Sequence, residues 1–278
     1  MKNQINLLNQ LQELVLTRDE HHATGDGSRM DALDKAIDDL VSSLQPEIRS
    51  LYTRLYKKDH IVMSPMNNGC CAICGMTLPI SQVQAVKLCR QIQNCPSCAR
   101  MLFLEEDGVP RWIGEKSSRT GPRKSGVSRF SAEELMIPDL KSSDTEGAIR
   151  ELAEAMERNK FVSRADALVA GALRRESMLS TALGDGLAFP HVRGVEGGGL
   201  TLALGVSKKG FVYDDGGEKV NIIFFSAIPA AVSPFYLRLM KCLTESFSKE
   251  ENRKALLSAQ TQAELWKALT KATRYTIK

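Results

Sequence analysis

Two C-x-x-C pairs constrain the fold of this chain more than any other feature of its sequence: Cys71–Cys74 and Cys95–Cys98. About 20 residues separate the pairs, a spacing that lets four thiolates close a tetrahedron around Zn²⁺. Redox-active or incidental cysteines are the alternative, but two pairs in one short segment favour a metal site. Four cysteine ligands leave no position for water, so we expect a structural zinc ion that stabilises a segment too small to hold its own core.

The sequence contains 7 cysteines, so three lie outside the predicted metal site. Cys70 could compete with Cys71 for the metal, but the two-residue spacing to Cys74 favours Cys71 as the ligand. Cys89 has no assigned role, and Cys242 falls on a helical pattern that predicts burial in a core.

No apolar run reaches the length of about 18 residues that a membrane-spanning helix needs. The longest candidate, Ile222–Val232, is interrupted by Ser226 and Pro229, and the N-terminus lacks the features of a signal peptide. We therefore expect a cytoplasmic protein that does not insert into a membrane, in which cysteines are thiols or metal ligands rather than disulfides.

Residues 1–62 carry apolar side chains at helical spacing, in two runs that Gly25 and Gly27 separate. A helical hairpin or a coiled coil that forms a homodimer would each bury this stripe. Pro46 allows either a kink or the restart of a helix. His21 and His22 are expected to be a solvated pair, since no partner ligands for a metal are near them in the sequence.

Residues 63–104 contain the cysteine pairs, with CGMTLP after the first and CPSCARMLF around the second. This segment resembles the C4-type zinc ribbon that follows a long helical hairpin in a family of bacterial coiled-coil proteins. The resemblance implies no enzymatic activity, and it does not say whether the ribbon contacts protein or nucleic acid.

A histidine at the end of a short apolar strand is the second chemical signal. The turn Gly184-Asp185-Gly186 precedes the strand Leu187–Phe189, which Pro190 and His191 end, so the imidazole is expected at the rim of a sheet. An imidazole can hold a labile phosphoryl group, and the guanidinium of Arg175 is suited to phosphate oxygens. A histidine that makes one structural hydrogen bond is the alternative.

The surrounding residues resemble a known signature: Arg175-Glu176, followed by STALGDGLAFPH from Ser180 to His191. They resemble the RE…ST-x-x-G-x-G-x-A-x-P-H pattern of the fructose/mannitol/nitrogen-type enzyme IIA domain (type 2) of the bacterial phosphotransferase system. The resemblance implies that His191 accepts a phosphoryl group from the carrier HPr and passes it on, usually to an enzyme IIB. It also implies that Arg175 and Thr181 orient the phosphate and that Gly184, Asp185 and Gly186 form a phosphate loop.

One position departs from the family pattern. Many members carry a second histidine seven residues after the proline that closes the apolar strand, and here that position is Tyr236. A phenol donates one hydrogen bond but carries no positive charge. Acceptance of a phosphoryl group is therefore expected to survive, whereas fast onward transfer is in doubt, which suits a regulator better than a transport component.

Residues 105–129 are expected to be a basic, flexible linker, because Gly, Ser, Pro and positive charges replace apolar periodicity between Gly108 and Ser128. A basic arm that binds nucleic-acid phosphates is the alternative.

Residues 130–278 alternate helical and strand patterns, which predicts an α/β domain with helices on both faces of a mixed sheet. Three capping signals mark expected helix starts: Ser143-x-x-Glu146, Ser163-x-x-Asp166 and Thr261-x-x-Glu264. The other expected elements are strands at Leu200–Val206 and Val220–Ile228, turns at Lys208–Gly210 and Asp214–Gly217, and a helix at Pro234–Phe247.

These patterns favour a regulatory phosphocarrier with an interaction module in front of it. The rival interpretation is a zinc-ribbon and coiled-coil adaptor for protein or nucleic acid, whose enzyme IIA-like domain transfers nothing. A transport enzyme IIA with an added N-terminal segment is a third reading.

Overall fold

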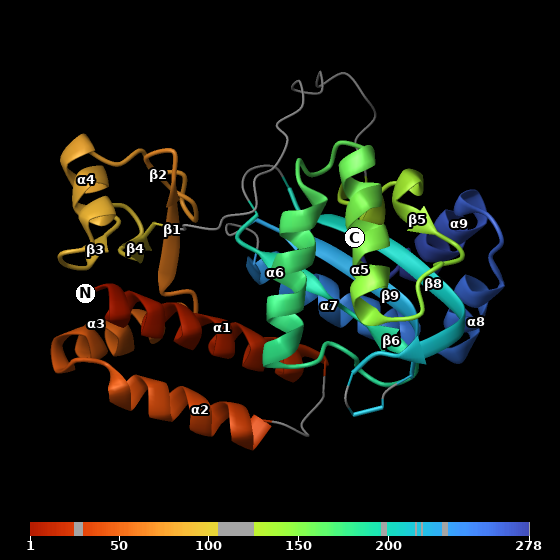
Figure 1. The fold of residues 1–278 in the computed structure, drawn as a ribbon, viewed down its shortest axis with the longest axis horizontal. Helices are drawn as coiled ribbons and strands as arrows, with labels where there is room; N and C mark the ends of the chain where they lie inside the picture. Colours follow the sequence, from red (N-terminus) through yellow and green to blue (C-terminus); the bar gives the residue numbers. More distant parts are fainter. Residues whose placement is uncertain are drawn as a thin grey trace. The chain divides into compact units, whose positions relative to one another are not determined.

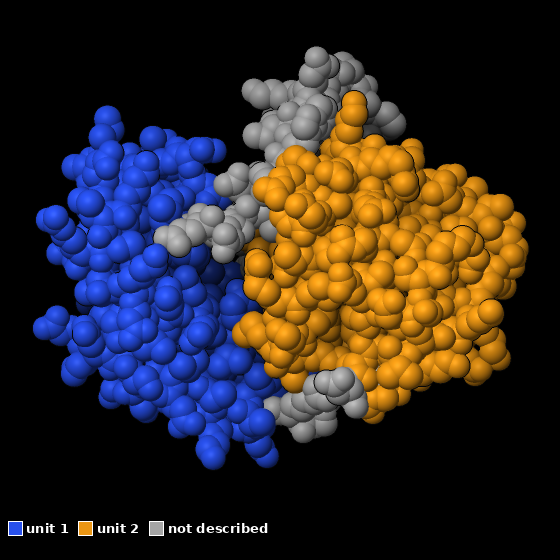
Figure 2. All heavy atoms as spheres, viewed as in Figure 1, with its two compact units in different colours: residues 1–107 blue, residues 108–278 orange. Residues whose placement is uncertain are grey.

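A computed structural model describes residues 1–24, 30–104, 125–195, 199–214, 216–217, 219–229 and 233–277. The chain divides into two compact units, Met1–Asp107 and Gly108–Lys278 (Figure 2). Among the described residues, none of the helices is both long enough and apolar enough to cross a membrane. Most of the expected linker, residues 105–124, lies outside the described residues. Its last residues form a 3₁₀ helix, η1 (Gly126–Arg129), that contributes the buried Val127 to the core of the second unit.

Three helices begin the first unit: α1 (Lys2–Thr24), α2 (Met30–Ser43) and α3 (Pro46–Tyr56). The predicted helical hairpin is confirmed, because α1 and α2 pack along each other (Figure 1). Pro46 is the first residue of α3. The N–H at this position has no partner within a helix, so the missing N–H of proline costs no hydrogen bond there. The apolar stripe of α1 is buried within the chain itself, so it does not need a second copy to cover it.

The two neighbouring histidines of α1 differ in their surroundings. His22 is exposed as expected, but His21 is only 5% exposed, so the prediction of a solvated pair is wrong for it. The helical pattern of burial explains the difference, because adjacent helical residues point about 100° apart and only one of them faces the core.

A small ribbon follows the helices in the same unit. Its elements are β1 (Met63–Asn67), β2 (Cys70–Cys71), α4 (Ile80–Leu88), β3 (Gln93–Asn94) and β4 (Met101–Phe103). The strands lie in the order β2-β1-β4-β3, and only the β1–β4 pair is parallel.

Gln12 of α1 joins the helices to the ribbon. Its side-chain oxygen accepts hydrogen bonds from the backbone N–H groups of Val62 and Met63, at 2.7 and 3.1 Å, and its amide donates to the carbonyl of His60 at 2.9 Å. Met63 and Met101 of the ribbon share a buried cluster with apolar residues of the helices. Residues 1–62 and 63–104 are therefore parts of one unit rather than two separate domains.

The second unit is built on a mixed sheet, as the sequence predicted. The strands are β5 (Met136–Ile137), β6 (Leu187–Ala188), β7 (His191–Arg193), β8 (Thr201–Val212) and β9 (Lys219–Ile228). They lie in the order β5-β8-β9-β6, with β7 also paired to β9. The central β8–β9 pair is antiparallel and the other pairs are parallel.

Helices cover both faces of this sheet, which was also predicted. They are α5 (Thr145–Arg158), α6 (Ala165–Met178), α7 (Ser233–Phe247), α8 (Glu250–Ser258) and α9 (Gln262–Thr273). In Figure 1, α5 and α6 lie in front of the sheet, and α7 lies behind it. A second 3₁₀ helix, η2 (Glu133–Leu135), precedes β5.

Some local predictions need correction. The cap of α5 is Asp144, whose carboxylate accepts from the Gly147 N–H, and the residue before α6 is Arg164, so Ser143 and Ser163 do not cap. The capping box of Thr261 and Glu264 is confirmed. Lys208–Gly210 is not a turn, because β8 runs through it with a register shift against β9 between Val206 and Phe211. A separate helix, α8, was not expected.

Candidate functional site

His191 begins β7, where the chain resumes pairing with β9 after a short interruption. The strands β6 and β7 pair with β9 in one continuous parallel register, with Leu187 opposite Ile222 and His191 opposite Ser226. Pro190 causes the interruption because it has no N–H to donate, but its carbonyl accepts from the Ser226 N–H at 3.0 Å. The imidazole therefore starts from a backbone that the sheet holds on both sides of the break.

The side chain of His191 is buried, with 1% of its surface exposed. The sequence predicted an imidazole at the rim of the sheet, and the structure differs because a helix from later in the chain covers it. The ring of Tyr236, on α7, lies 5.1 Å from the imidazole between centroids, at an interplanar angle of 44°. Tyr236 is itself 1% exposed.

One hydrogen bond sets the proton distribution on the imidazole. The Nδ1 atom of His191 lies 3.1 Å from the carbonyl oxygen of Phe189. A carbonyl can only accept, so Nδ1 carries the proton that is donated. In the neutral ring, the lone pair available for a nucleophilic attack is then on Nε2.

Strand alternation divides the side chains of β7 between two helices. Val192 points toward α6, where a Cβ added to Gly171 would lie 2.9 Å from Val192 Cγ1, so the helix can approach the strand only because residue 171 is glycine. His191 and Arg193 point to the opposite face, toward α7. The Cζ atom of Arg193 lies 5.5 Å from the centroid of the Tyr236 ring, so both residues contact the same ring.

Arg175 lies in the last turn of α6, as predicted, and is 7% exposed. Its Nη1 donates to the carbonyl of Leu179 at 2.8 Å, which ties the end of the helix to the segment that leads into Thr181. The guanidinium is thus partly committed to the backbone in this structure.

Thr181 is held by a residue that sequence reasoning had left without a role, Glu176. The Glu176 carboxylate accepts hydrogen bonds from the backbone N–H of Thr181 at 3.0 Å and from its hydroxyl. The Thr181 carbonyl in turn accepts from the N–H of Phe189 at 3.1 Å, and the Phe189 carbonyl accepts from His191. This chain of contacts runs from α6 to the imidazole. The adjacency of Glu176 to Arg175 in the matched motif was the available signal.

Removal from water shifts the pKa values of two groups in this network, Glu176 and Tyr213. Desolvation raises the pKa of Glu176, although the two hydrogen bonds from Thr181 and the nearby charges of Arg175 and His191 oppose that rise. The hydroxyl of Tyr213 lies 3.3 Å from that of Thr181, and burial raises the pKa of this phenol as well. The carboxylate side of the site is therefore a poorly solvated environment in which charge interactions are stronger than in water.

The turn formed by Gly184, Asp185 and Gly186 lies at the other end of this strand. All three residues have positive φ, at 76°, 54° and 75°, which explains the two glycines. Arg253 of α8 binds the Asp185 carboxylate through two contacts of 3.3 Å. Five residues of extended chain, about 16 Å, separate Gly186 from His191. The turn starts the strand that carries His191, and its role as a phosphate loop stays a prediction.

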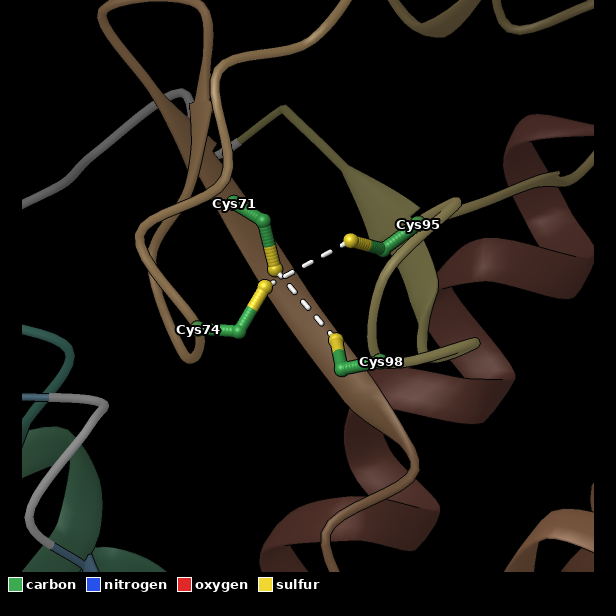
Figure 3. A group of neighbouring side chains, drawn as sticks. All are labelled: Cys71, Cys74, Cys95 and Cys98. Atoms are coloured by element: carbon green, nitrogen blue, oxygen red, sulfur yellow. Dashed lines mark hydrogen bonds between the residues drawn. The ribbon is translucent and has the colours of Figure 1, made fainter.

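The four predicted metal ligands come together in the first unit (Figure 3). The Sγ atoms of Cys71, Cys74, Cys95 and Cys98 all lie within 4.8 Å of one another, with 3.7 Å for Cys71–Cys98 and 3.6 Å for Cys74–Cys95. Zinc–sulfur bonds of about 2.3 Å in a tetrahedron place sulfurs about 3.8 Å apart, so the cluster fits a zinc ion. Cys70 is not in the cluster, and its Sγ lies 3.7 Å from the Thr77 hydroxyl.

The two cysteine pairs repeat one backbone arrangement. The N–H of the fourth residue after each first cysteine, Gly75 or Ala99, donates to that cysteine's carbonyl, at 2.8 and 2.9 Å. Gly75 and Ala99 both have positive φ, at 74° and 62°. A buried hydroxyl, from Ser64, lies 3.1 Å from Cys71 Sγ and is placed to support a thiolate ligand. The sequence had indicated the ligands but not this repeat.

Comparison with known proteins matches residues 129–272 to the family described as "Phosphoenolpyruvate-dependent sugar phosphotransferase system, EIIA 2". The "PTS system fructose-specific EIIA component" of Haloferax volcanii is 27% identical over 137 residues, which cover 49% of this chain and 89% of that protein. The "PTS system fructose-specific EIIABC component" of Bacillus subtilis is 27% identical over 125 residues, and the match spans only 20% of its length. The crystal structure of "Nitrogen Regulatory Protein IIA-Ntr from Neisseria meningitidis" is 24% identical with a TM-score of 0.46, covering 51% of this chain and 97% of that one.

Proposed function

Through residues 129–272 the chain belongs to the EIIA 2 family of the phosphoenolpyruvate-dependent sugar phosphotransferase system, and we propose that His191 accepts a phosphoryl group from the phosphohistidine of HPr. The observation that carries the proposal is the hydrogen bond between His191 Nδ1 and the Phe189 carbonyl. It fixes the ring and leaves Nε2 as the nucleophile. The membership of the family supports the reaction class, and the hydrogen bond at Nδ1 supports Nε2 as the attacking atom.

The transfer step forms one phosphorus–nitrogen bond and breaks another. The Nε2 lone pair attacks phosphorus, the bond between phosphorus and the donor imidazole breaks, and the donor nitrogen keeps the electron pair. The proton on Nδ1 stays on the ring, hydrogen-bonded to Phe189. No metal is needed, since positioning in line and donors to the phosphoryl oxygens lower the barrier.

Arg175 and Thr181 are proposed to serve this step from the α6 side. Arg175 would meet the negative charge of the phosphoryl oxygens, as arginine does in many phosphate sites. Thr181 would hold the Phe189 backbone, and through it the imidazole, in the geometry that transfer needs. Because His191 is 1% exposed, the side chains that cover it must move aside when the donor docks.

We propose a regulatory role in the cytoplasm, in which an enzyme IIB or a regulated protein target either accepts the phosphoryl group from His191 or responds to its presence. Tyr236 stands where the family pattern places a second histidine. The four clustered cysteines of the first unit would hold a structural zinc ion, and the segment that they stabilise would be available for contacts with a partner. Phosphate on His191 would add charge to a buried site, and such local changes are commonly read out elsewhere in a molecule.

A second candidate is an adaptor whose enzyme IIA-like unit transfers nothing. The burial of His191 under Tyr236 favours it, because an inaccessible nucleophile cannot meet a donor. Most of the basic segment that would bind nucleic acid, residues 105–129, lies outside the described residues, which resume at Ser125.

One experiment separates the two functions. The full chain is incubated with phosphoenolpyruvate and purified cognate enzyme I and HPr, and its mass is measured at neutral pH. We expect one added phosphoryl group on the wild type, lost in acid, and none on His191→Ala. His22→Ala, at an exposed histidine of the first unit, is the matched control and should be labelled like the wild type. An unlabelled wild type would leave only the adaptor.

A further inference from the structure

We propose that Arg193 supplies the positive charge beside His191 that Tyr236 cannot, so that Arg193 and Tyr236 together replace the second histidine found in many relatives. The proposal rests on phosphorylation of His191, and it adds a residue that the matched signature does not include. It predicts that phosphoryl transfer in this chain is supported by a residue of β7 itself, in addition to Arg175 at the end of α6.

The strand geometry places Arg193 on the same face as His191. Residues i and i+2 of a strand point to the same side and are about 6.6 Å apart along it, which is within the reach of an arginine side chain. Val192, between them, packs against Gly171 of α6, so His191 and Arg193 both face α7. Arg175, by contrast, belongs to α6 and donates to the Leu179 carbonyl.

The ring of Tyr236 is the common contact of the two residues. Its centroid lies 5.1 Å from that of the imidazole and 5.5 Å from the Arg193 Cζ, a distance at which a guanidinium interacts with the face of an aromatic ring. A ring that is 1% exposed is a rigid platform, and it limits where the guanidinium can go. Tyr236 thus positions a charge, although it carries none itself.

The Arg193 guanidinium would interact with the phosphoryl oxygens when Nε2 of His191 bears phosphorus. During transfer the phosphoryl group carries negative charge on oxygens that the imidazole cannot neutralise, and a guanidinium presents several N–H donors in a planar fork suited to those oxygens. Arg193 is half-buried, so solvent screens its charge less than that of an exposed arginine. The bonds that form and break are those of the transfer between the HPr imidazole and Nε2, and Arg193 exchanges no atom.

The test compares single-turnover rates in the full chain, with HPr phosphorylated by enzyme I as donor and unphosphorylated HPr as acceptor for the return reaction. Arg193→Gln is expected to slow both directions by about 100-fold, the lower end of the range for removing one donor that stabilises charge in a transition state. Arg193→Lys keeps the positive charge but lacks the planar fork of N–H donors, so its transfer rate should lie between those of the wild type and Arg193→Gln. Arg174→Gln removes an exposed arginine of α6 and is the matched control.

A double variant distinguishes charge from packing. Arg193→Gln combined with Tyr236→His restores a titratable cation at the family position, and an imidazole is charged only below about pH 6.5. Its rate, divided by that of Arg193→Gln alone, should exceed 1 at about pH 6 and approach 1 at about pH 8. A merely structural role for Arg193 predicts the same pH dependence when Tyr236→His is compared with the wild type, whereas a charge supplied by Arg193 predicts that this dependence is largely lost there.

The outcomes separate the two proposals. A wild type that HPr does not label removes the proposed function itself, and the present inference with it. A labelled wild type with equal rates for Arg193→Gln and Arg174→Gln overturns the role of Arg193 and leaves phosphorylation of His191 standing. If Arg193→Gln is poorly folded by circular dichroism, Arg193→Met, which keeps the apolar stem of the side chain, takes its place, and a rate equal to that of Arg174→Gln overturns the proposal.

Discussion

The cysteine cluster and the His191 site are assembled in opposite ways. Each half of the cluster is a short turn that carries two ligands, and the two turns repeat the same backbone hydrogen bonds at Gly75 and Ala99. The environment of His191 is collected from three separate elements, α6, β7 and α7, and α7 begins about 40 residues after β7 ends. Local chain geometry therefore determines the first site, whereas the packing of a whole unit determines the second.

The difference has consequences for stability. A structural zinc site contributes its binding free energy to folding, so losing one ligand removes much of what holds a small unit together. The His191 site contributes little to stability by itself, and its geometry depends on a large buried cluster that belongs to the second unit alone. Changes at the two sites should therefore affect different units and different observables.

The largest expected effect is the loss of one zinc ligand. Cys98→Ser should abolish binding of one zinc per chain and remove a share of a binding free energy that is on the order of 10 kcal/mol in small zinc domains, so the first unit should not fold. Elemental analysis and differential scanning calorimetry measure both quantities. Cys70→Ser changes a cysteine that is also half-buried but lies outside the cluster, and it should keep the metal. A similar loss in both variants would contradict a four-cysteine site.

A change at Gly171 tests the opposite case, a site held by packing. An added Cβ would lie 2.9 Å from Val192 Cγ1, so Gly171→Ala should push α6 from β7 and destabilise the second unit by about 1–3 kcal/mol. It should also slow labelling of His191, the neighbour of Val192, while zinc content stays unchanged. Urea unfolding followed in each unit measures the effect. Gly199→Ala, where no atom would lie within 4 Å of the new Cβ, is the control. Equal stabilities would mean that the helix and strand are not in tight contact.

Glu176→Gln tests whether this half-buried carboxylate positions Thr181. We expect a loss of about 1–2 kcal/mol, because the amide can accept only one of the two hydrogen bonds that Thr181 donates. The pH dependence has a definite sign. Burial raises the folded pKa of Glu176, so its contribution is fully present below the unfolded value near 4.5 and is lost as pH rises through the folded pKa.

The wild type should therefore lose stability relative to Glu176→Gln as pH rises from about 4.5 toward neutrality. Denaturant unfolding of both proteins at several pH values gives this difference directly. Glu157→Gln, at an exposed glutamate of α5, supplies the control curve. A difference that grows with pH would show that the carboxylate is favoured in its charged form, contrary to the effect of burial.

The sequence could predict what depends on neighbouring residues. The ligand pairs, the helical stripe, the strand before His191 and the capping box of Thr261 all follow from spacing over a few residues. Where two local solutions share one pattern, the prediction was unreliable. Lys208–Gly210 suits a turn as well as a bulge, and Ser143 and Asp144 are both good caps.

The sequence could not predict what depends on long-range packing. The burial of His191 depends on Tyr236, which is brought over the ring by the placement of α7 across the sheet. The contact of both His191 and Arg193 with that ring depends on the direction in which β7 faces. The small size of Gly171 mattered only once α6 and β7 were known to touch. No short-range pattern carries this information.

The smallest expected effect compares the two halves of the cysteine cluster with each other. Gly75 and Ala99 occupy the same place in the two turns and both have positive φ, which favours glycine. No atom would lie within 4 Å of a Cβ at Gly75, so Gly75→Ala introduces only backbone strain and should destabilise the first unit by about 1 kcal/mol. Ala99→Gly removes the same strain, but the greater freedom of glycine in the unfolded chain offsets most of the gain. We therefore expect the free energy of unfolding of the first unit to rise by between 0 and about 1 kcal/mol.

Thermal unfolding of the zinc-loaded protein measures both single variants. Because the two turns share one backbone geometry, the swapped variant Gly75→Ala/Ala99→Gly should lie close to the sum of the single changes; a large deviation would show that the turns are coupled through the metal rather than built independently.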